Sequence, residues 1–367
     1  MNQRLIYVSM LLYCCFSLVL PVLFVNKIVF FLMFMVLACV IFKAKLQTFS
    51  PFIIFSIFLY SFVLSFGFDY SSGLRIQLML VTFTLFLIYL IETFAIDMNK
   101  VVISSSVVFS ISTLLLVYSV VNETSVIFLL FEKYGEIAVG SRDVGSGSQE
   151  FFRLGSAPFL YVGFSILLKR MTSNVKLMDC IYLVLIVTCI LLSSTRSILI
   201  GCILISFFIL FRKYLTLVLP LVLFSVVCIM MNTDFSGTMF DSNDFGNSIK
   251  LKDVGSFVDW ARPVNLLFGE GLASLYYSDG RGYLVSQTEI TLLDNVRYFG
   301  VPLTLIFYFA VLWPILNRVP WRVDNGFPFA VMSIYILMAL TNPMLINSFG
   351  FIVVLWYWAN ILKVTKK

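Results

Sequence analysis

The stretch Thr288-Glu289-Ile290-Thr291-Leu292-Leu293-Asp294-Asn295-Val296-Arg297-Tyr298-Phe299-Gly300 lies where a long polar segment ends and an apolar run of membrane length begins. Two acids and an arginine therefore stand at the boundary between a loop and a predicted membrane helix. Charged side chains at that depth are costly, and membrane proteins usually keep them for a function. Asp294 and Arg297 are three residues apart, so a second interpretation is that they pair on one helical face and mark the water boundary.

The composition around this stretch predicts a polytopic membrane protein. Of the 367 residues, 60% are apolar, 12% are charged and 39 are phenylalanine, a balance that leaves a soluble protein too little polar surface. The first apolar segment, near 5–25, lacks a convincing small-residue cleavage site and is followed at once by another. We therefore interpret it as a membrane helix and not as a cleaved signal peptide.

Apolar runs of bilayer length predict an all-α fold of about twelve transmembrane helices in a single integral membrane domain, residues 1–367. The expected spans lie near 5–25, 28–42, 51–68, 74–95, 101–121, 156–169, 178–193, 196–211, 214–231, 290–316, 327–346 and 348–363. With the N-terminus in the cytoplasm, basic pairs such as Lys169 and Arg170 fall in short cytoplasmic turns, as the positive-inside rule requires. The C-terminus is then cytoplasmic too, and two larger loops, about 122–155 and 232–287, are periplasmic.

Most of the bases expected on the outer side are arginines. They are Arg142 and Arg153 in the first loop, Arg262 and Arg281 in the second, and Arg196 and Arg297 at the outer ends of helices. Translocation disfavours cations on that side, so an anionic ligand is the expected reason for them. The arginine fork binds phosphate oxygens in a bidentate way, which suits a diphosphate at the membrane surface. The remaining outer bases are interpreted as solvated charges: Lys27, Arg75, Lys133, Lys250 and Lys252.

Several chemistries are excluded by residue usage. The chain has no histidine, which removes Ser/His and Cys/His catalysis and the commonest transition-metal ligand. The string Asp241-Ser242-Asn243-Asp244-Phe245-Gly246 begins like a calcium loop but has Phe245 at a ligand position. We therefore expect no metal and no cofactor. The pattern also argues against nucleic acid as a partner, because the basic residues are dispersed among the expected membrane helices.

The two outer loops differ in composition. In the first, Gly140 to Ser148 is rich in glycine and serine and is interpreted as a flexible loop. The second interleaves aromatic and polar residues, which is typical of a sugar-binding surface. These residues are Trp260, Arg262, Tyr276, Tyr277, Arg281 and Tyr283. An aromatic belt at the membrane interface gives the same composition, so both interpretations stay open.

Three strings carry a resemblance to a known family. They are Ser193-Ser194-Thr195-Arg196-Ser197, then Phe268-Gly269-Glu270-Gly271, and Glu289 followed by Leu292-Leu293 and Phe299-Gly300. Together with the large outer loop late in the chain, they resemble bacterial O-antigen polymerases of the Wzy type, which are related to O-antigen ligases. The ligase branch is expected to use a histidine in its late outer loop. The absence of histidine therefore favours a polymerase.

The resemblance implies a fold related to the GT-C membrane glycosyltransferases, and an inverting glycosyl transfer on the periplasmic face of the bacterial inner membrane. Both donor and acceptor would be glycans linked to undecaprenyl diphosphate, and the product would be O-antigen or a related surface polysaccharide of lipopolysaccharide biosynthesis. Membrane lipid is an implied partner, and a chain-length regulator is a further candidate.

The same resemblance marks Glu289 as the candidate base for the acceptor hydroxyl, with Asp294 as second choice. The arginines would neutralise the departing diphosphate without a metal, and Tyr276 and Tyr277 would contact the glycan. Two alternatives remain: a flippase or other transporter of lipid-linked oligosaccharide, and a ligase-type transferase. A transporter of two equal halves is disfavoured, because the longest loop lies between the ninth and tenth expected spans and no internal repeat is evident.

Overall fold

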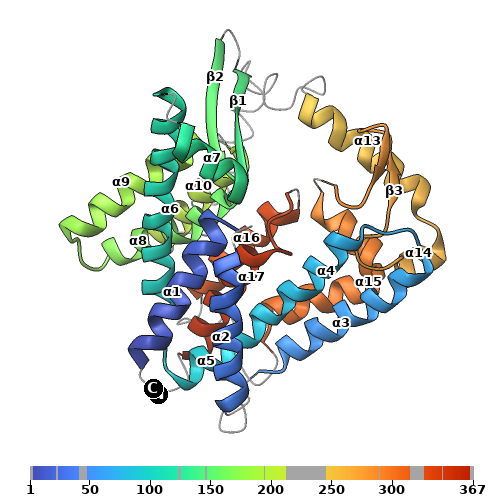
Figure 1. The fold of residues 1–367 in the computed structure, drawn as a ribbon, viewed down its shortest axis with the longest axis horizontal. Coiled ribbons are helices and arrows are strands. Elements are labelled where there is room, and N and C mark those ends of the chain that lie inside the picture. The colour runs from blue at the N-terminus through green and yellow to red at the C-terminus, as the bar shows by residue number, and fades with distance from the viewer. Residues whose placement is uncertain are drawn as a thin grey trace.

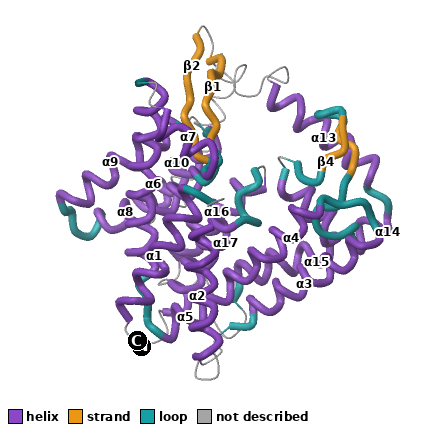
Figure 2. The backbone as a smooth tube through the Cα atoms, in the orientation of Figure 1, coloured by secondary structure: helices purple, strands orange, loops and turns teal. Residues whose placement is uncertain are grey.

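The computed structural model describes residues 3–21, 24–40, 48–122, 125–144, 147–193, 195–211, 245–288, 290–314, 326–340 and 342–363. Within these ranges the chain is mostly helical, with two short β-hairpins (Figures 1 and 2). The first half contains α1 (Gln3–Val19), α2 (Phe24–Val40), α3 (Ser50–Leu64), α4 (Ser72–Val81), α5 (Ile88–Thr93), α6 (Met98–Val121) and α7 (Ser125–Tyr134). The second half contains α8 (Leu160–Met171), α9 (Leu177–Leu192), α10 (Arg196–Phe211), α13 (Phe245–Trp260), α14 (Pro263–Phe268), α15 (Thr291–Leu312), α16 (Gly326–Leu340) and α17 (Ser348–Lys363).

Within the described residues, four helical segments are long and apolar enough to cross a membrane. They are Ser50–Gly67, Ser72–Thr93, Met98–Val121 and Thr291–Leu312; in the second of these a 3₁₀ turn, Thr82–Leu87, joins α4 to α5. Shorter apolar helices occupy six of the other expected spans. The span expected near 156–169 holds α8, which ends in Lys169 and Arg170 and is not one of these apolar helices, and the span near 214–231 lies outside the described residues. Large apolar side chains on the helix surfaces face outward, such as Leu177 at 77% and Leu305 at 65% exposure. Such surfaces favour lipid over water as their surroundings.

The centre of the helical bundle is α17. Its residues from Phe351 to Trp358 are all fully buried, as expected of a helix that is apolar on every face. The two indole N–H groups still find acceptors: Trp356 Nε1 donates to Asn99 Oδ1 at 2.7 Å, and Trp358 Nε1 donates to the Val311 carbonyl at 2.9 Å. The C-terminal helix thereby ties α6 and α15 to the core.

The two polar segments expected to be loops contain regular structure. The first holds α7 and a hairpin of β1 (Ile137–Val144) and β2 (Gly147–Leu154), and the second holds α13, α14 and a hairpin of β3 (Tyr276–Ser278) and β4 (Tyr283–Val285). Figure 1 places the β1–β2 hairpin, α13 and β3 toward one end of the molecule and the first turn of α1 toward the opposite end. These described parts of both polar segments thus lie away from the start of α1.

The structure contradicts the prediction of a flexible loop between Gly140 and Ser148. Its described residues form antiparallel strands, paired from Ile137 opposite Leu154 to Val144 opposite Gly147. Phe152 and Leu154 are buried at the base of the hairpin, where β2 packs against α6 and α9. Apolar side chains at that base anchor the strands, so glycine and serine between them do not prevent pairing.

A break in α15 separates its polar first turns from its apolar remainder. Gly300 has φ 75° and ψ 165°, and Pro302 follows in the next turn. Proline and non-helical glycine remove backbone hydrogen bonds from the helix. Neighbouring groups take over the freed carbonyls: Arg297 O accepts from the Glu270 N–H at 2.7 Å, and Tyr298 O accepts from Ser61 Oγ at 2.6 Å.

Candidate functional site

The first turns of α15 hold a buried ion pair. Arg297 Nη1 lies 3.0 Å from Asp294 Oδ1, and the side chains are 0% and 2% exposed. The spacing of three residues puts both on one helical face. Of the two interpretations from the sequence, this geometry matches mutual pairing at the start of the helix.

Further contacts close this group, which we call the entrance cluster: Ser274, Tyr276, Thr288, Asp294 and Arg297. The second carboxylate oxygen of Asp294 accepts from the Thr288 N–H at 2.8 Å. Arg297 Nη2 donates to the Ser274 carbonyl, and its guanidinium carbon lies 3.8 Å from the centre of the Tyr276 ring. Burial raises the pKa of Tyr276, so its phenol is neutral at physiological pH. The cluster is therefore only partly satisfied from within, because Arg297 Nε and the Tyr276 hydroxyl are buried without a hydrogen-bond partner among the described residues.

Alternation along β3 separates the two candidate tyrosines. Tyr276 and Ser278 are buried, whereas Tyr277 between them is 54% exposed, because successive strand residues face opposite sides. Tyr276 consequently belongs to the entrance cluster, and Tyr277 points away from it.

Two of the strings that carry the family resemblance, 268–271 and 299–300, contain glycines and meet at the break in α15. Gly269 and Gly300 have positive φ, and a Cβ on Gly269 would lie 2.7 Å from the backbone N of Gly300. Gly271 also has positive φ, and a Cβ there would lie 2.3 Å from the backbone N of Ser65. Only glycine allows both this conformation and this close backbone approach. The strings 268–271 and 299–300 therefore dock the second polar segment onto α3 and α15.

The remaining candidate residues are distributed over the molecule. Arg281 is half-buried in the turn between β3 and β4, and Arg262 is exposed just before α14. Arg196 is half-buried at the first residue of α10. Arg142 lies on β1 and Arg153 on β2, and nothing further is described of these two side chains. Glu289 lies outside the described residues. The structure thus brings Asp294, Arg297 and Tyr276 together, with Arg281 on the adjoining hairpin.

Arg75, interpreted from the sequence as a solvated charge, is buried, so that prediction is wrong. Its side chain is 7% exposed, and its guanidinium carbon lies 3.7, 4.3 and 4.7 Å from the ring centres of Tyr70, Phe66 and Phe62. Nη1 also donates to Ser65 Oγ at 3.3 Å. Aromatic faces attract a guanidinium strongly once water is excluded. The regular spacing of these aromatics was the signal in the sequence that could have indicated this cage.

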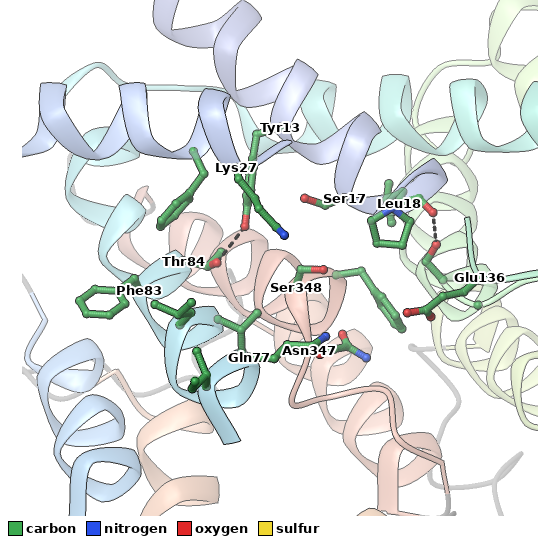
Figure 3. Close-up of a pocket in the computed structure, with 18 of the residues that line it drawn as sticks. Tyr13, Ser17, Leu18, Lys27, Gln77, Phe83, Thr84, Glu136, Asn347 and Ser348 are labelled. Carbon is green, nitrogen blue, oxygen red and sulfur yellow. Dashed lines mark hydrogen bonds between the residues drawn. The ribbon is translucent and has the colours of Figure 1, made fainter. Parts of the chain in front are cut away.

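A cavity of about 630 Å³ opens at the base of the β1–β2 hairpin (Figure 3). We call it the hairpin-base cavity. Its walls come from α1, α2, the segment of α4 and the following 3₁₀ turn, the residues flanking the hairpin, and the residues at the start of α17. Its polar lining includes Lys27, Gln77, Glu136, Asn347 and Ser348. One wall is apolar, with Phe30, Phe31, Ile76, Leu80, Val81 and Phe83.

Local structure fixes several of these polar groups. The Glu136 carbonyl accepts from the Gly155 N–H at 2.7 Å, and a Cβ on Gly155 would lie 2.6 Å from Glu136 Oε2, so glycine makes room for the carboxylate. The surroundings raise the pKa of Glu136 by burial, although part of the side chain remains exposed. Asn347 accepts from the Gly350 N–H at 2.7 Å and so caps α17. Across the cavity, the Tyr13 hydroxyl pairs with Thr84 Oγ1 at 2.8 Å.

Sequence reasoning did not identify this cavity. Lys27 was interpreted as a solvated charge, and it is exposed although it lines the cavity. Gln77 was included in the span near 74–95, and Asn347 falls between the spans near 327–346 and 348–363. The available signal was an isolated amide inside an apolar run, which membrane helices avoid without a reason. Among the described residues, no group of three acidic or cysteine side chains is arranged to hold a metal ion.

Comparison of the chain with family models, with curated proteins and with solved structures finds no significant match. The fold and the site therefore define a class: a helical protein in which four described helices are long and apolar enough to cross a membrane.

Proposed function

We propose that the protein is a membrane glycosyltransferase that polymerises undecaprenyl-diphosphate-linked repeat units into O-antigen or a related surface polysaccharide. In this proposal it has about twelve transmembrane helices in a fold related to the GT-C glycosyltransferases, with both termini cytoplasmic and the two polar segments on the periplasmic side of the inner membrane. The main structural support is the hairpin-base cavity, where polar groups beside a polar segment adjoin an apolar wall made by membrane helices. A substrate with a glycan and a polyprenyl chain requires both surfaces.

The proposed reaction is an inverting displacement. The acceptor hydroxyl oxygen forms a bond to the anomeric carbon of the donor glycan, the bond from that carbon to the diphosphate oxygen breaks, and the hydroxyl proton passes to a carboxylate. Arg142, Arg153, Arg196, Arg262 and Arg281 are the candidates that stabilise the departing undecaprenyl diphosphate electrostatically, and no metal ion takes part. Arg297 is left out of this role because it is fully buried and paired with Asp294. Such charge stabilisation and proton acceptance are the two demands on the protein.

Glu289 is the proposed base. Asp294 is a weaker candidate, because its two oxygens already accept from Arg297 and from the Thr288 N–H. Since Thr288 directly precedes Glu289 in the chain, Asp294 has a positioning role in this proposal. It holds the segment that carries the base.

Reconstitution tests the function directly. Purified protein in proteoliposomes is given radiolabelled lipid-linked repeat units extracted from the producing bacterium, with no other enzyme. We expect a ladder of longer lipid-linked glycans on gel electrophoresis. Unchanged glycan length accompanied by movement of the units across the bilayer would instead identify a transporter.

Glu289→Gln tests the proposed base. This variant keeps the size and hydrogen bonding of the side chain but removes its basic lone pair, so turnover should fall by about 10²–10⁴-fold with an unchanged melting temperature. Asp294→Asn is the comparator, and it should lower the melting temperature because it weakens the buried pair with Arg297. Near-normal turnover in Glu289→Gln would remove Glu289 from the mechanism.

A further inference from the structure

We propose that the hairpin-base cavity binds the neutral sugar head of the lipid-linked acceptor, and that the diphosphate of the substrates is held elsewhere. This inference rests on the proposed function and assigns a substrate part to a site that the sequence did not reveal. Figure 3 shows Lys27 from α2 and Glu136 from the hairpin base reaching toward the space from two sides, with Gln77 and Asn347 also bordering it.

The charge of the lining argues against a phosphate group. Among the described lining residues, the charged ones are a single lysine, Lys27, and a single glutamate, Glu136, so their formal charges cancel. A diphosphate is multiply charged and is best held by several arginines or by arginines with a metal. The lining residues that the structure describes include no arginine, and the Glu136 carboxylate would repel phosphate oxygens.

The polar groups of the lining match sugar hydroxyls instead. A hydroxyl both donates and accepts a hydrogen bond, and the amide of Gln77 and the hydroxyl of Ser348 can do the same. Asn347 contributes less, because its amide oxygen caps α17 and its Nδ2 donates to the Pro343 carbonyl at 3.0 Å. Lys27 adds a donor and Glu136 adds an acceptor. The cavity volume of about 630 Å³ is in the range of small-molecule sites, about 300–1,000 Å³.

The apolar wall can contact the apolar parts of the substrate, which are the C–H-rich sugar faces and the attached lipid chain. Phe30, Phe31 and Phe83 present aromatic side chains to the cavity, and aromatic faces stack on the C–H-rich faces of sugars. Phe31 and Leu80 are 60% and 58% exposed, so this wall continues onto the outer surface of the helices. A lipid chain attached to the sugar can therefore leave the cavity sideways, along α2 and α4, without burial of a charged group.

Two probes, each derived from one part of the natural substrate, test the assignment. The first is the repeat-unit oligosaccharide, released from its lipid by mild acid and coupled at its reducing end to a neutral dodecyl amide. The second is undecaprenyl diphosphate without a sugar. Protein in phospholipid nanodiscs is treated with an amine-acylating reagent in the presence of each probe, and the acylation of individual lysines is followed by mass spectrometry. Lys133, an exposed lysine on α7 outside the cavity, is the internal control.

We expect the neutral glycan probe to slow acylation of Lys27 but not of Lys133, and undecaprenyl diphosphate to protect neither. Glu136→Gln and Gln77→Ala should each weaken protection by the glycan probe about tenfold, the loss of one good hydrogen bond. Glu132→Gln is the matched control, because Glu132 is exposed on α7 and does not line the cavity. It should leave protection unchanged.

Protection of Lys27 by undecaprenyl diphosphate, or by neither probe, would overturn the assignment. The outcome is also separable from that of the proposed function. Polymerisation without protection of Lys27 would retain the polymerase and remove the acceptor site from this cavity. Protection without polymerisation would retain a glycan site and remove the polymerase.

Discussion

The entrance cluster and the hairpin-base cavity hold their charges in opposite ways. In the entrance cluster, the guanidinium of Arg297 is enclosed by a carboxylate, a carbonyl and an aromatic ring. In the cavity, Lys27 and Glu136 border an open volume. Asp294 and Arg297 are therefore paired inside the fold, whereas a modest set of amides, hydroxyls and two charges surrounds the space where a ligand fits.

Removal of one partner from the entrance cluster should have the largest effect. Arg297→Ala leaves Asp294 buried without its cation, which should lower the free energy of unfolding by about 3–5 kcal/mol. Chemical unfolding of the purified protein in detergent measures this loss. Arg262→Ala is the control, because Arg262 is exposed, and it should change stability by less than about 0.5 kcal/mol. Equal stability of the two variants would contradict a structural role for the cluster.

The next largest loss of stability should come from Gly271, where the second polar segment packs closely against the backbone of Ser65. Gly271→Ala introduces both a strained positive φ and a clash with the backbone of Ser65, so we expect a loss of about 2–4 kcal/mol. Gly282 has a similar φ of 75° but open space around its Cβ position. Gly282→Ala should therefore cost only the strain, about 1 kcal/mol. The difference between the two melting temperatures isolates the contact, and no difference would show that the close approach is unimportant.

Substitution of Arg75 in its aromatic cage should have a third, smaller effect on stability. Arg75→Lys keeps the charge but loses the flat guanidinium that stacks on Tyr70 and Phe66, and should cost about 1–2 kcal/mol. Arg262→Lys is the exposed comparison in the same unfolding assay. If both substitutions are neutral, the cage contributes little, and Arg75 would be available for another role.

Glu136→Gln, in the cavity, should have the smallest effect on stability, and that effect should depend on pH. The folded-state pKa of Glu136 is raised by burial, so ionisation of this group disfavours the folded state. At pH 7 to 8, Glu136→Gln should therefore raise the melting temperature slightly. The gain should vanish as the pH falls toward about 4, where the carboxyl is protonated even in the unfolded chain. A gain that persists unchanged at low pH would have another cause.

Glu132→Gln again serves as the control for Glu136→Gln.

Much of the fold could be predicted because it depends on local pattern. Apolar runs of sufficient length mark the helices, and even the pairing of Asp294 with Arg297 follows from a spacing of three residues. The hairpin at 137–154 could not be predicted from its glycines and serines. Phe152 and Leu154 are buried where β2 packs against α6 and α9. The sequence of the hairpin alone does not show this long-range contact.

The cavity shows the same limit more strongly. Its lining comes from residues as distant in sequence as Lys27, Gln77, Glu136 and Asn347, and no local pattern shows that they share one space. Only packing of four separate parts of the chain gives them a common space. The expected role of Arg75 failed for a related reason, because the turn after α3 brings the aromatic rings around it.

The break in α15 also has a consequence for biogenesis. Within hydrocarbon, each unsatisfied backbone group costs several kcal/mol, so the first turns of α15 cannot be released into lipid alone. The Tyr298 carbonyl is satisfied by Ser61 on α3, which is synthesised 237 residues earlier. In the proposed membrane arrangement, we therefore expect α15 to integrate fully only once α3, made much earlier in synthesis, lies beside it.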